Sequence, residues 1–381
     1  MPASSVQRHA NNGRRIGLAL ALAWFCAGPT SASEPDPRAS ALIAELGLTA
    51  SAQAARDLAG WQVPKRIVVA HADARRLAGL QASAPGVELL AAAEGKKLNE
   101  QLREAQAVIG LCDAATLAAA ESLHWVQVLW VGVERCVALP GLAERGIVLT
   151  NMQRTSAAPI AEHAIALMMA LARGLPRFSV AQQQGRWRGE ESNPVQLREL
   201  GGRTLLVVGL GGIGTEVARR AHGLGMRVIA TRNSSRTGPS FVARVGLSDE
   251  LLAFAAEADV VVNATPLTAD TTGLFDQRFF AALKPGAYFI NVGRGRSVVS
   301  ADLLAALQNG RLAGAGLDVT DPEPLPSDHP LWQQANVIIT PHVAASSDLQ
   351  GERYWIVVAE NLRRYVAGEP LLNVVDIRRG Y

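Results

Sequence analysis

The sequence has little of what marks several classes of protein. Only three of its 381 residues are cysteines, which excludes a disulfide-rich scaffold and a zinc site built from four cysteines. The formal net charge is only +3, whereas a nucleic-acid binder carries a clear excess of clustered basic residues. Aromatic residues are 5% of the chain, yet hydrophobic residues reach 49% and charged residues only 19%, which excludes a disordered chain. We therefore expect a globular protein of about two or three domains that binds no nucleic acid.

The N-terminal segment has the organisation of an export signal. Arg8, Arg14 and Arg15 precede a short apolar run over residues 16–27, and a Gly-Pro pair then leads to small residues. This run is shorter than the roughly 20 residues that a membrane-spanning helix needs, so we expect no stable membrane anchor. We predict a signal peptide over residues 1–32 and a periplasmic or otherwise exported protein, and the paired arginines also permit the twin-arginine route. The alternative is a cytoplasmic protein whose N-terminal tail is not translocated.

From residue 65 on, short apolar segments alternate with helical ones in two separate runs. The strands expected in the first run are 67–70, 87–90, 107–111, 125–130 and 147–150, and those in the second are 204–210, 227–231, 260–264, 287–292, 314–319 and 337–340. Helices with apolar faces are expected over 160–175 and 352–366. Strands that alternate with helices form parallel sheets covered on both faces. The pattern predicts an α/β fold of two doubly wound parallel-sheet domains, Rossmann-like or flavodoxin-like, with a cleft between them.

The first strand of the second run leads directly into a glycine-rich loop and then a helix. The loop reads Gly209-Leu210-Gly211-Gly212-Ile213-Gly214. In such a loop Gly209 permits the tight turn, Gly211 lets the backbone approach a pyrophosphate, and Gly214 lets the helix pack closely on the strand. The N–H groups at the start of the helix then face the phosphates. With a strand before it and a helix and second strand after it, the loop predicts dinucleotide binding; the alternative is an ordinary glycine-rich turn.

The end of the second strand indicates which dinucleotide is bound. A site for NAD places an Asp or Glu there to hold the ribose hydroxyls. The chain instead reads Thr231-Arg232-Asn233-Ser234-Ser235-Arg236, without an acid. Arg232 and Arg236, with Ser234 between them, suit a 2′-phosphate. We therefore favour NADP(H) and keep NAD(H) as possible; the alternative is that both arginines are merely solvated.

Several short motifs further along the chain occur together in a fixed order. They are Ala161-Glu162-His163, Asn291-Val292-Gly293-Arg294-Gly295, Gly316-Leu317-Asp318-Val319 followed by Glu323-Pro324, Thr340-Pro341-His342, Asn361-Leu362, and Asn373-Val374-Val375-Asp376. Together they resemble the motifs of the D-isomer-specific 2-hydroxyacid dehydrogenases, and in particular those of NADP-type glyoxylate/hydroxypyruvate reductases. The resemblance covers residues 65–381.

This resemblance implies an activity and a domain organisation. The implied enzyme reduces a small 2-oxo acid to a D-2-hydroxy acid with a hydride from NAD(P)H. The implied substrate (catalytic) domain spans 33–155 and is completed by 346–381, with an NAD(P)-binding Rossmann domain over 156–345. A homodimer is also implied, and no metal site is expected.

Three residues suit the chemistry of such a reduction, which needs a proton donor and a grip on the substrate carboxylate. His342 is the natural proton donor, because imidazole titrates near neutral pH. Glu323 is its natural partner, because a carboxylate orients the ring and favours its protonated form. Arg294 can bind the carboxylate in a bidentate fork and polarise the carbonyl. We predict these three residues as the catalytic set; taken singly, each could be an ordinary loop residue.

The resemblance also implies further contacts. The backbone N–H groups of Val131 and Gly132 should hold the substrate carboxylate. Trp130, just before them, departs from the small residue of most members, and it could narrow the pocket, stack on a substrate or merely pack. The cofactor contacts expected are Gly209, Gly211, Gly212, Ile213, Gly214, Arg232, Ser234, Arg236, Thr265, Pro266, Val292 and Asp318.

Two rival functions and one open question accompany this interpretation. The C-terminal-binding corepressors use the same fold as a cofactor-sensing interaction module, so an exported binding protein without turnover is one rival. A dehydrogenase of another small anion, such as phosphite or formate, is the other, although formate dehydrogenases place Gln where Glu323 stands. Cys112 and Cys136 could pair in an oxidising compartment or remain two buried thiols.

Overall fold

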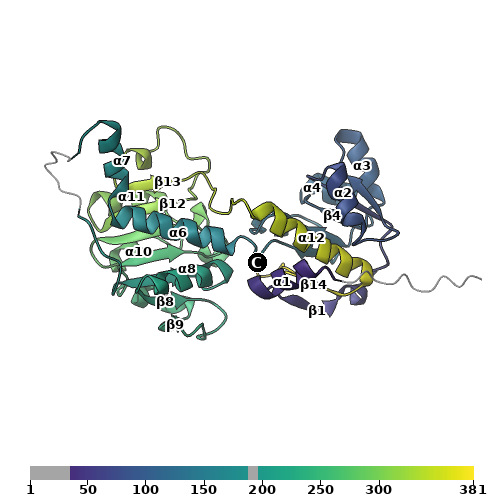
Figure 1. The fold of residues 1–381 in the computed structure, drawn as a ribbon, viewed down its shortest axis with the longest axis horizontal. Coiled ribbons are helices and arrows are strands. Elements are labelled where there is room, and N and C mark those ends of the chain that lie inside the picture. The colour runs from purple at the N-terminus through teal and green to yellow at the C-terminus, as the bar shows by residue number, and fades with distance from the viewer. Residues whose placement is uncertain (1–34, 188–195) are drawn as a thin grey trace, which may run out of the picture. The chain divides into compact units, whose positions relative to one another are not determined.

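The computed structural model describes residues 35–187 and 196–381 (Figure 1). The predicted signal peptide over residues 1–32 lies outside these residues. Two parallel sheets, of five and seven strands, carry most of the described chain, and a small antiparallel pair joins its two ends. The predicted α/β fold with two doubly wound parallel sheets is confirmed.

The five-stranded sheet has the order β3-β2-β4-β5-β6. Its strands are β2 (Arg66–Val69), β3 (Glu88–Ala91), β4 (Ala107–Ile109), β5 (Trp125–Gln127) and β6 (Val148–Thr150), and the helices between them are α2 (Ala74–Gln81), α3 (Gly95–Arg103), α4 (Ala114–Ala119) and α5 (Glu134–Val137). All neighbouring strands are parallel. This is the flavodoxin-like order. The strand expected over 125–130 ends at Gln127, because the chain already leaves the sheet toward residues 131–134.

The seven-stranded sheet has the order β13-β12-β11-β10-β7-β8-β9, which is the Rossmann order with one further strand at the edge. Its strands are β7 (Thr204–Val208), β8 (Arg227–Thr231), β9 (Arg244–Gly246), β10 (Val260–Asn263), β11 (Ala287–Asn291), β12 (Leu312–Leu317) and β13 (Val337–Ile339). The helices of this part are α6 (Ala157–Ala172), α7 (Leu175–Gln183), α8 (Gly212–Gly223), α9 (Leu251–Ala255), α10 (Gln277–Ala282) and α11 (Ser300–Gln308). Strand β9 is only three residues long and was not expected from the sequence.

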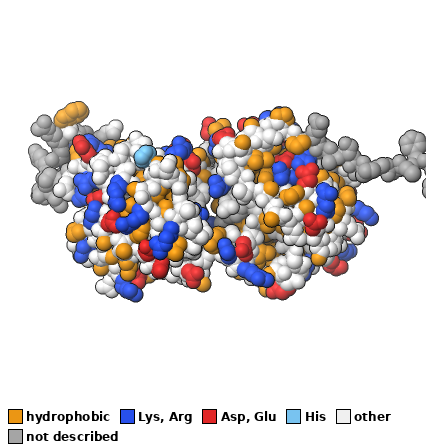
Figure 2. Space-filling view, turned by 90° about the horizontal axis from the view of Figure 1, so that it is seen from below, with side chains coloured by type: hydrophobic (Ala, Val, Ile, Leu, Met, Phe, Trp, Pro, Cys, Tyr) orange, Lys and Arg blue, Asp and Glu red, His pale blue; other side chains and the backbone are white. Residues whose placement is uncertain are grey.

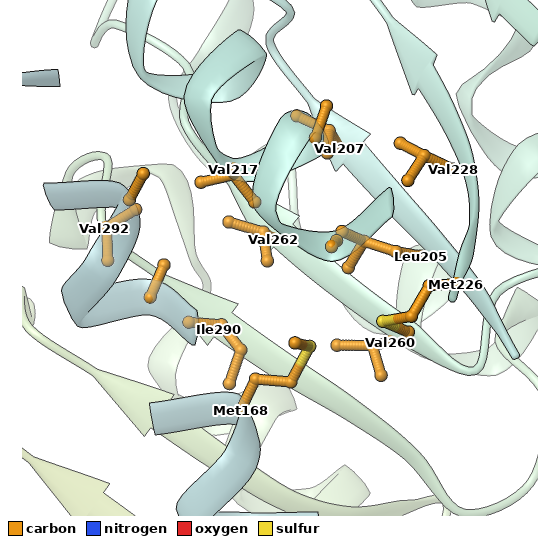
Figure 3. Close-up of a cluster of buried hydrophobic side chains, with 14 of the residues drawn as sticks. Met168, Leu205, Val207, Val217, Met226, Val228, Val260, Val262, Ile290 and Val292 are labelled. Atoms are coloured by element: carbon orange, nitrogen blue, oxygen red, sulfur yellow. The ribbon is translucent and has the colours of Figure 1, made fainter. Parts of the chain in front are cut away.

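Alternate side chains of the larger sheet enter two separate cores. Leu205, Val207 and Val262 pack under α6 and α8, where Met168 and Val217 are directed onto the strands (Figure 3). Leu206, Val261 and their equivalents face the opposite side, under α9, α10 and α11. Because both faces are covered, the central strands β7, β10 and β11 are buried along their whole length, and the functional side chains are left to the loops at the strand ends.

The end of the chain belongs to the part that holds the five-stranded sheet. Helix α12 (Gln350–Ala367) buries Val358, Leu362 and Tyr365 in the same core as β2, β4 and β5, and the Tyr365 ring lies 4.8 Å from that of Trp125. Burial of each such side chain contributes roughly 1.5–3 kcal/mol to the free energy of folding. The Asn361 amide donates to the Gln127 side chain at 2.8 Å, which fixes the helix on the sheet.

A short antiparallel pair near the two ends of the described chain was not expected from the sequence. Strand β1 (Ala50–Ala54) follows helix α1 (Pro37–Leu46) and pairs with β14 (Pro370–Leu372). The remaining short helices are 3-10 turns at Ala55–Asp57, Ser248–Glu250, Ala269–Thr271, Gly295–Ser297 and Pro330–Gln333. Within the described ranges no helix alone is long and apolar enough to cross a membrane, and only the bent pair α6–α7 reaches that length and composition.

The surface gives no sign of a strongly charged patch on the face seen in Figure 2. Lys and Arg side chains are interspersed there with Asp and Glu. A nucleic-acid binder carries its basic residues on one face or stripe. The distribution agrees with the low net charge of the sequence.

Candidate active site

The glycine-rich loop has the geometry that the sequence predicts. Strand β7 ends at Val208, Gly209 turns the chain with φ 95°, and α8 begins at Gly212. A Cβ atom on Gly209 would lie 2.8 Å from the Ala264 carbonyl oxygen, and one on Gly214 would lie 2.0 Å from the Gly209 carbonyl oxygen. Both positions therefore require glycine for packing reasons alone.

The same loop leaves room for a dinucleotide. A Cβ atom on Gly211 would meet nothing within 4 Å, so open space lies in front of this residue. No side chain caps the first turn of α8, which leaves the N–H groups of its first residues, Gly212, Ile213 and Gly214, open to an anion. Open space and uncapped N–H groups together fit the pyrophosphate of NAD(P).

The structure separates the two arginines that the sequence placed at a 2′-phosphate. Arg236 forms an ion pair with Glu250 and is occupied by it. Arg232 donates to the Thr237 carbonyl at 3.4 Å, and its buried Nε has no hydrogen-bond partner. Ser234 is exposed beside them. Arg232 therefore has more donor capacity left for a phosphate than Arg236.

The loops after β10 and β11 are joined by one buried amide. Asn263 accepts from the N–H and the hydroxyl of Thr265, at 3.0 and 2.7 Å, and donates to Asn291 and Ser297. Two further predicted contacts, Pro266 and Val292, lie in these same loops, with Val292 buried. This network fixes the loop that precedes Arg294.

The predicted acid–base pair is formed. His342 Nδ1 lies 2.6 Å from Glu323 Oε1, and both side chains are partly exposed. His342 has φ 54°, a left-handed conformation that is unfavourable for a residue with a side chain. The pairing at Nδ1 leaves Nε2 as the ring nitrogen that can face a substrate.

Asp318 holds the segment that carries His342. It is buried, and its carboxylate accepts from the N–H groups of Val343 and Ala344 at 3.0 Å each and from the Thr340 hydroxyl at 2.7 Å. Its carbonyl oxygen also accepts from the His342 N–H at 2.8 Å. The contact of Asp318 with the cofactor stays a prediction; what the structure shows is that this residue anchors the histidine loop.

Arg294 reaches the predicted substrate loop. Its guanidinium lies so close to Gly132 that a Cβ atom there would be 1.5 Å from Nη2 and 2.8 Å from Glu134 Oε2, so a larger residue would have to displace these side chains. Neither Val131 nor Gly132 donates its N–H to an acceptor within the described residues. Two open N–H groups beside a guanidinium form a site for a carboxylate. Trp130, the residue before them, is 39% exposed.

Glu134 belongs to this site and was not singled out from the sequence. Its Oε1 accepts from Arg294 Nε at 2.8 Å. Burial raises the pKa of the Glu134 carboxyl, but the hydrogen bond and charge of Arg294 outweigh burial and bring that pKa below its ordinary value. The sequence does show an acid two residues after Gly132. Its partner Arg294 lies far away along the chain, so the contact could not be predicted.

A pocket of about 790 Å³ lies beside Glu134. Ser234 and Asn233 at the end of β8, Leu267 and Thr268 after β10, and the C-terminal residues 377–381 all line it. Of the residues predicted at the 2′-phosphate, Ser234 thus faces the same pocket as Glu134.

Helix α5, which starts at Glu134, is cross-linked. Cys136 on this helix forms a disulfide with Cys112, with their Cα atoms 5.8 Å apart. The sequence left two alternatives for these cysteines, a disulfide or two buried thiols, and the structure has the disulfide. The bond ties the helix after the substrate loop to the segment after β4.

Comparisons with known proteins agree with this geometry. The family model described as D-isomer specific 2-hydroxyacid dehydrogenase, NAD binding domain, matches residues 165–344. A D-3-phosphoglycerate dehydrogenase of Archaeoglobus fulgidus is 34% identical over 267 residues, which are 70% of this chain but 49% of that protein. The chain thus spans about half the length of the phosphoglycerate dehydrogenases that it matches.

Other relatives match over most of their length. Glyoxylate/hydroxypyruvate reductase A of Serratia proteamaculans is 33% identical over 68% of this chain and 82% of its own. The crystal structure of a D-isomer specific 2-hydroxyacid dehydrogenase from Xanthobacter autotrophicus, in complex with NADPH, matches with a TM-score of 0.71 at 31% identity, over 84% of this chain and 100% of that one. With its sheets, its loops and these relatives in agreement, the chain belongs to the D-isomer specific 2-hydroxyacid dehydrogenase family.

Proposed function

We propose that the protein reduces a small 2-oxo acid to a D-2-hydroxy acid with NADPH. The observation that carries the proposal is the His342–Glu323 pair, 2.6 Å apart, in a chain whose Arg294 lies over two open amide groups. A proton donor and a carboxylate site are the two things that the protein itself must supply for this reaction. A binding module without turnover is not favoured, because it needs no such pair.

The chain's own residues account for binding and proton transfer. The N–H groups of Val131 and Gly132 and the guanidinium of Arg294 hold the substrate carboxylate, and Arg294 polarises the carbonyl. NADPH, when bound, supplies the hydride for C2. His342 gives its proton from Nε2 to the carbonyl oxygen, and Glu323 orients the ring through Nδ1.

The preference for NADPH rests on the end of β8. No acid stands there to hold the ribose hydroxyls, and the Arg232 side chain donates only to the Thr237 carbonyl among the described residues, so its guanidinium has donors left for a 2′-phosphate. The Xanthobacter relative was crystallised with NADPH, which supports the same choice. In this proposal NAD(H) is the weaker cofactor.

For the substrate we propose an acid of the glyoxylate or hydroxypyruvate type. The Serratia relative carries the name of a reductase for these two acids. The exposed Trp130 stands next to the proposed carboxylate site, where a bulky ring favours a small substrate.

A spectrophotometric assay at 340 nm tests the activity. Protein without residues 1–32 is mixed with NADPH or NADH and with glyoxylate, hydroxypyruvate, pyruvate or phenylpyruvate. We expect turnover that is fastest with NADPH and the two smaller acids. Binding of both cofactors without any turnover would contradict the proposal and favour an interaction module.

We further propose that the protein is exported. The arginines, apolar run and small residues of the segment 1–32 support this, and so does the Cys112–Cys136 disulfide, because disulfides persist in oxidising compartments. Fractionation of cells that express the full chain, with N-terminal sequencing, tests it. A mature chain that begins near residue 33 in the periplasm is expected; an intact N-terminus in the cytoplasm would contradict export.

As an assembly we propose a homodimer, which the family resemblance supports. Light scattering on the purified chain measures its mass in solution. A mass equal to that of one chain would contradict the dimer.

A further inference from the structure

A carboxylate in a site for an anionic substrate needs a physical reason. Glu134 lies at the start of α5, directly after the Val131–Gly132 amides, and its side chain is 30% exposed. Its lowered pKa keeps it negative near neutral pH, so it cannot serve as a proton donor there. A negative charge beside the proposed carboxylate site repels the substrate and weakens its binding. Glu134 must therefore have another effect that favours substrate binding.

The contacts of Arg294 show how Glu134 favours substrate binding. Its Nε donates to Glu134 Oε1 at 2.8 Å, and its Nη1 donates to the Gly293 carbonyl at 2.8 Å. These two acceptors hold the guanidinium from two directions. The remaining nitrogen, Nη2, lies over Gly132, beside the open N–H groups.

Without Glu134 the arginine would have only one acceptor to orient it. Arginine carries about 2 kcal/mol of rotamer entropy, so a single carbonyl contact orders it poorly. An ionised partner makes a stronger hydrogen bond than a neutral one and also balances the charge of the half-buried guanidinium. The pair thus keeps Arg294 in place before any substrate arrives.

We propose that Glu134 is a positioning residue, which holds Arg294 over Gly132 so that Nη2 and the two N–H groups form a ready-made carboxylate site. The inference rests on the proposed function, because it takes the bound carboxylate to be that of a 2-oxo acid. In this proposal Glu134 acts through Arg294, which its Oε1 contacts, while its Oε2 lies near Gly132. Substrate binding leaves the Glu134–Arg294 contact intact.

Binding of oxamate, an unreactive 2-oxo acid analogue, tests this without any need for turnover. Calorimetry on the NADPH-loaded protein compares wild type, Glu134→Ala and Glu134→Gln, with Glu121→Ala as the control, since Glu121 is an exposed acid of the same part of the chain. In Glu134→Ala we expect oxamate affinity to fall about tenfold or more, the effect of losing a hydrogen bond to a charged group. Glu134→Gln keeps a neutral acceptor for Arg294 Nε, so it should bind oxamate more tightly than Glu134→Ala and recover most of this loss.

The outcomes separate the alternatives. If both variants bind oxamate more tightly than wild type, Glu134 competes with the substrate for Arg294, and the inference is overturned. Unchanged binding in Glu134→Ala overturns it as well. A wild-type protein that binds NADPH but no oxamate overturns the proposed function, and the inference with it. Melting temperature and NADPH affinity, both expected to stay unchanged in Glu134→Gln, show that this variant is folded.

Discussion

Two loops of this protein are proposed to hold an anion, each by different means. The loop Gly209–Gly214 follows β7 and opens the long helix α8, whose first N–H groups face the ligand space. The loop Val131–Glu134 follows β5 and opens only the four-residue helix α5. The first loop needs no charged side chain, whereas the second receives its positive charge from Arg294, after β11 in the other sheet.

The two sites differ in how far apart their residues lie in the sequence. In the first loop, Gly214 is required by the loop's own backbone, since a Cβ atom there would clash with the Gly209 carbonyl, and Gly209 is required by the Ala264 carbonyl after β10. Gly132 instead faces the end of a side chain, Arg294, from far along the sequence. A phosphate site is thus contained in one segment, while the carboxylate site exists only when two distant segments meet.

The largest effect should come from the chemical step. In His342→Ala we expect kcat with glyoxylate to fall about 1,000-fold, because the proton donor is lost, while NADPH affinity stays unchanged. Steady-state kinetics and fluorescence titration of NADPH measure the two quantities. His222→Ala, an exposed histidine on α8, is the matched control. A similar loss of NADPH affinity in His342→Ala would contradict a role of His342 in the chemical step alone.

Removal of the Cys112–Cys136 disulfide, near the loop Val131–Glu134, should have the next largest effect. The disulfide closes a loop between positions 24 residues apart in the sequence. Cys112→Ser/Cys136→Ser should therefore lower the free energy of unfolding by about 3 kcal/mol. Urea denaturation of the oxidised wild type, the reduced wild type and the double variant measures this. Equal stability of all three would mean that the bond does not form in solution.

Two glycine substitutions should distinguish packing from ligand approach in the phosphate loop. Gly211→Ala adds a methyl group into open space, so we expect unchanged melting temperature but NADPH binding weaker by about 2 kcal/mol, because hydrogen bonds to the pyrophosphate are blocked. Gly214→Ala should instead lower the melting temperature, because its Cβ would lie 2.0 Å from a carbonyl oxygen. Differential scanning fluorimetry and NADPH titration separate the two. Equal effects on both readouts would contradict the assignment.

The smallest effect concerns the choice of cofactor. Arg232→Ala should reduce the preference for NADPH over NADH about tenfold, the loss of one charged hydrogen bond. Arg236→Ala should change this preference less, since Glu250 already occupies that side chain. The ratio of kcat/KM for the two cofactors is the measurement. A larger change in Arg236→Ala would reverse the roles of the two arginines.

The sequence predicted those features that depend on local order along the chain. The strands of both sheets and the glycine loop could be predicted because buried parallel strands and tight turns have local signatures. The Arg294–Glu134 contact could not, because it joins residues 160 positions apart. Strands β1 and β14 escaped notice for a related reason, since β1 (Ala50–Ala54) has no apolar pattern and gains its partner only from the end of the chain. The difference between Arg236, which is paired with Glu250, and Arg232, which is not, could not be predicted either. The sequence does not show that Glu250 lies beside Arg236.

The pairing of β1 with β14 sets an order of events during synthesis. The larger sheet and α6 form one continuous stretch, from Ala157 to Ile339, which is finished while the last forty or so residues are still inside or near the ribosome. The part around the smaller sheet must wait for α12 and β14, although its strands are made first. We therefore expect ribosome-bound chains that end near residue 345, once extended by an unstructured linker, to bind NADPH before any carboxylate site is complete. A nascent chain that binds no NADPH at this stage would show that the two parts fold together.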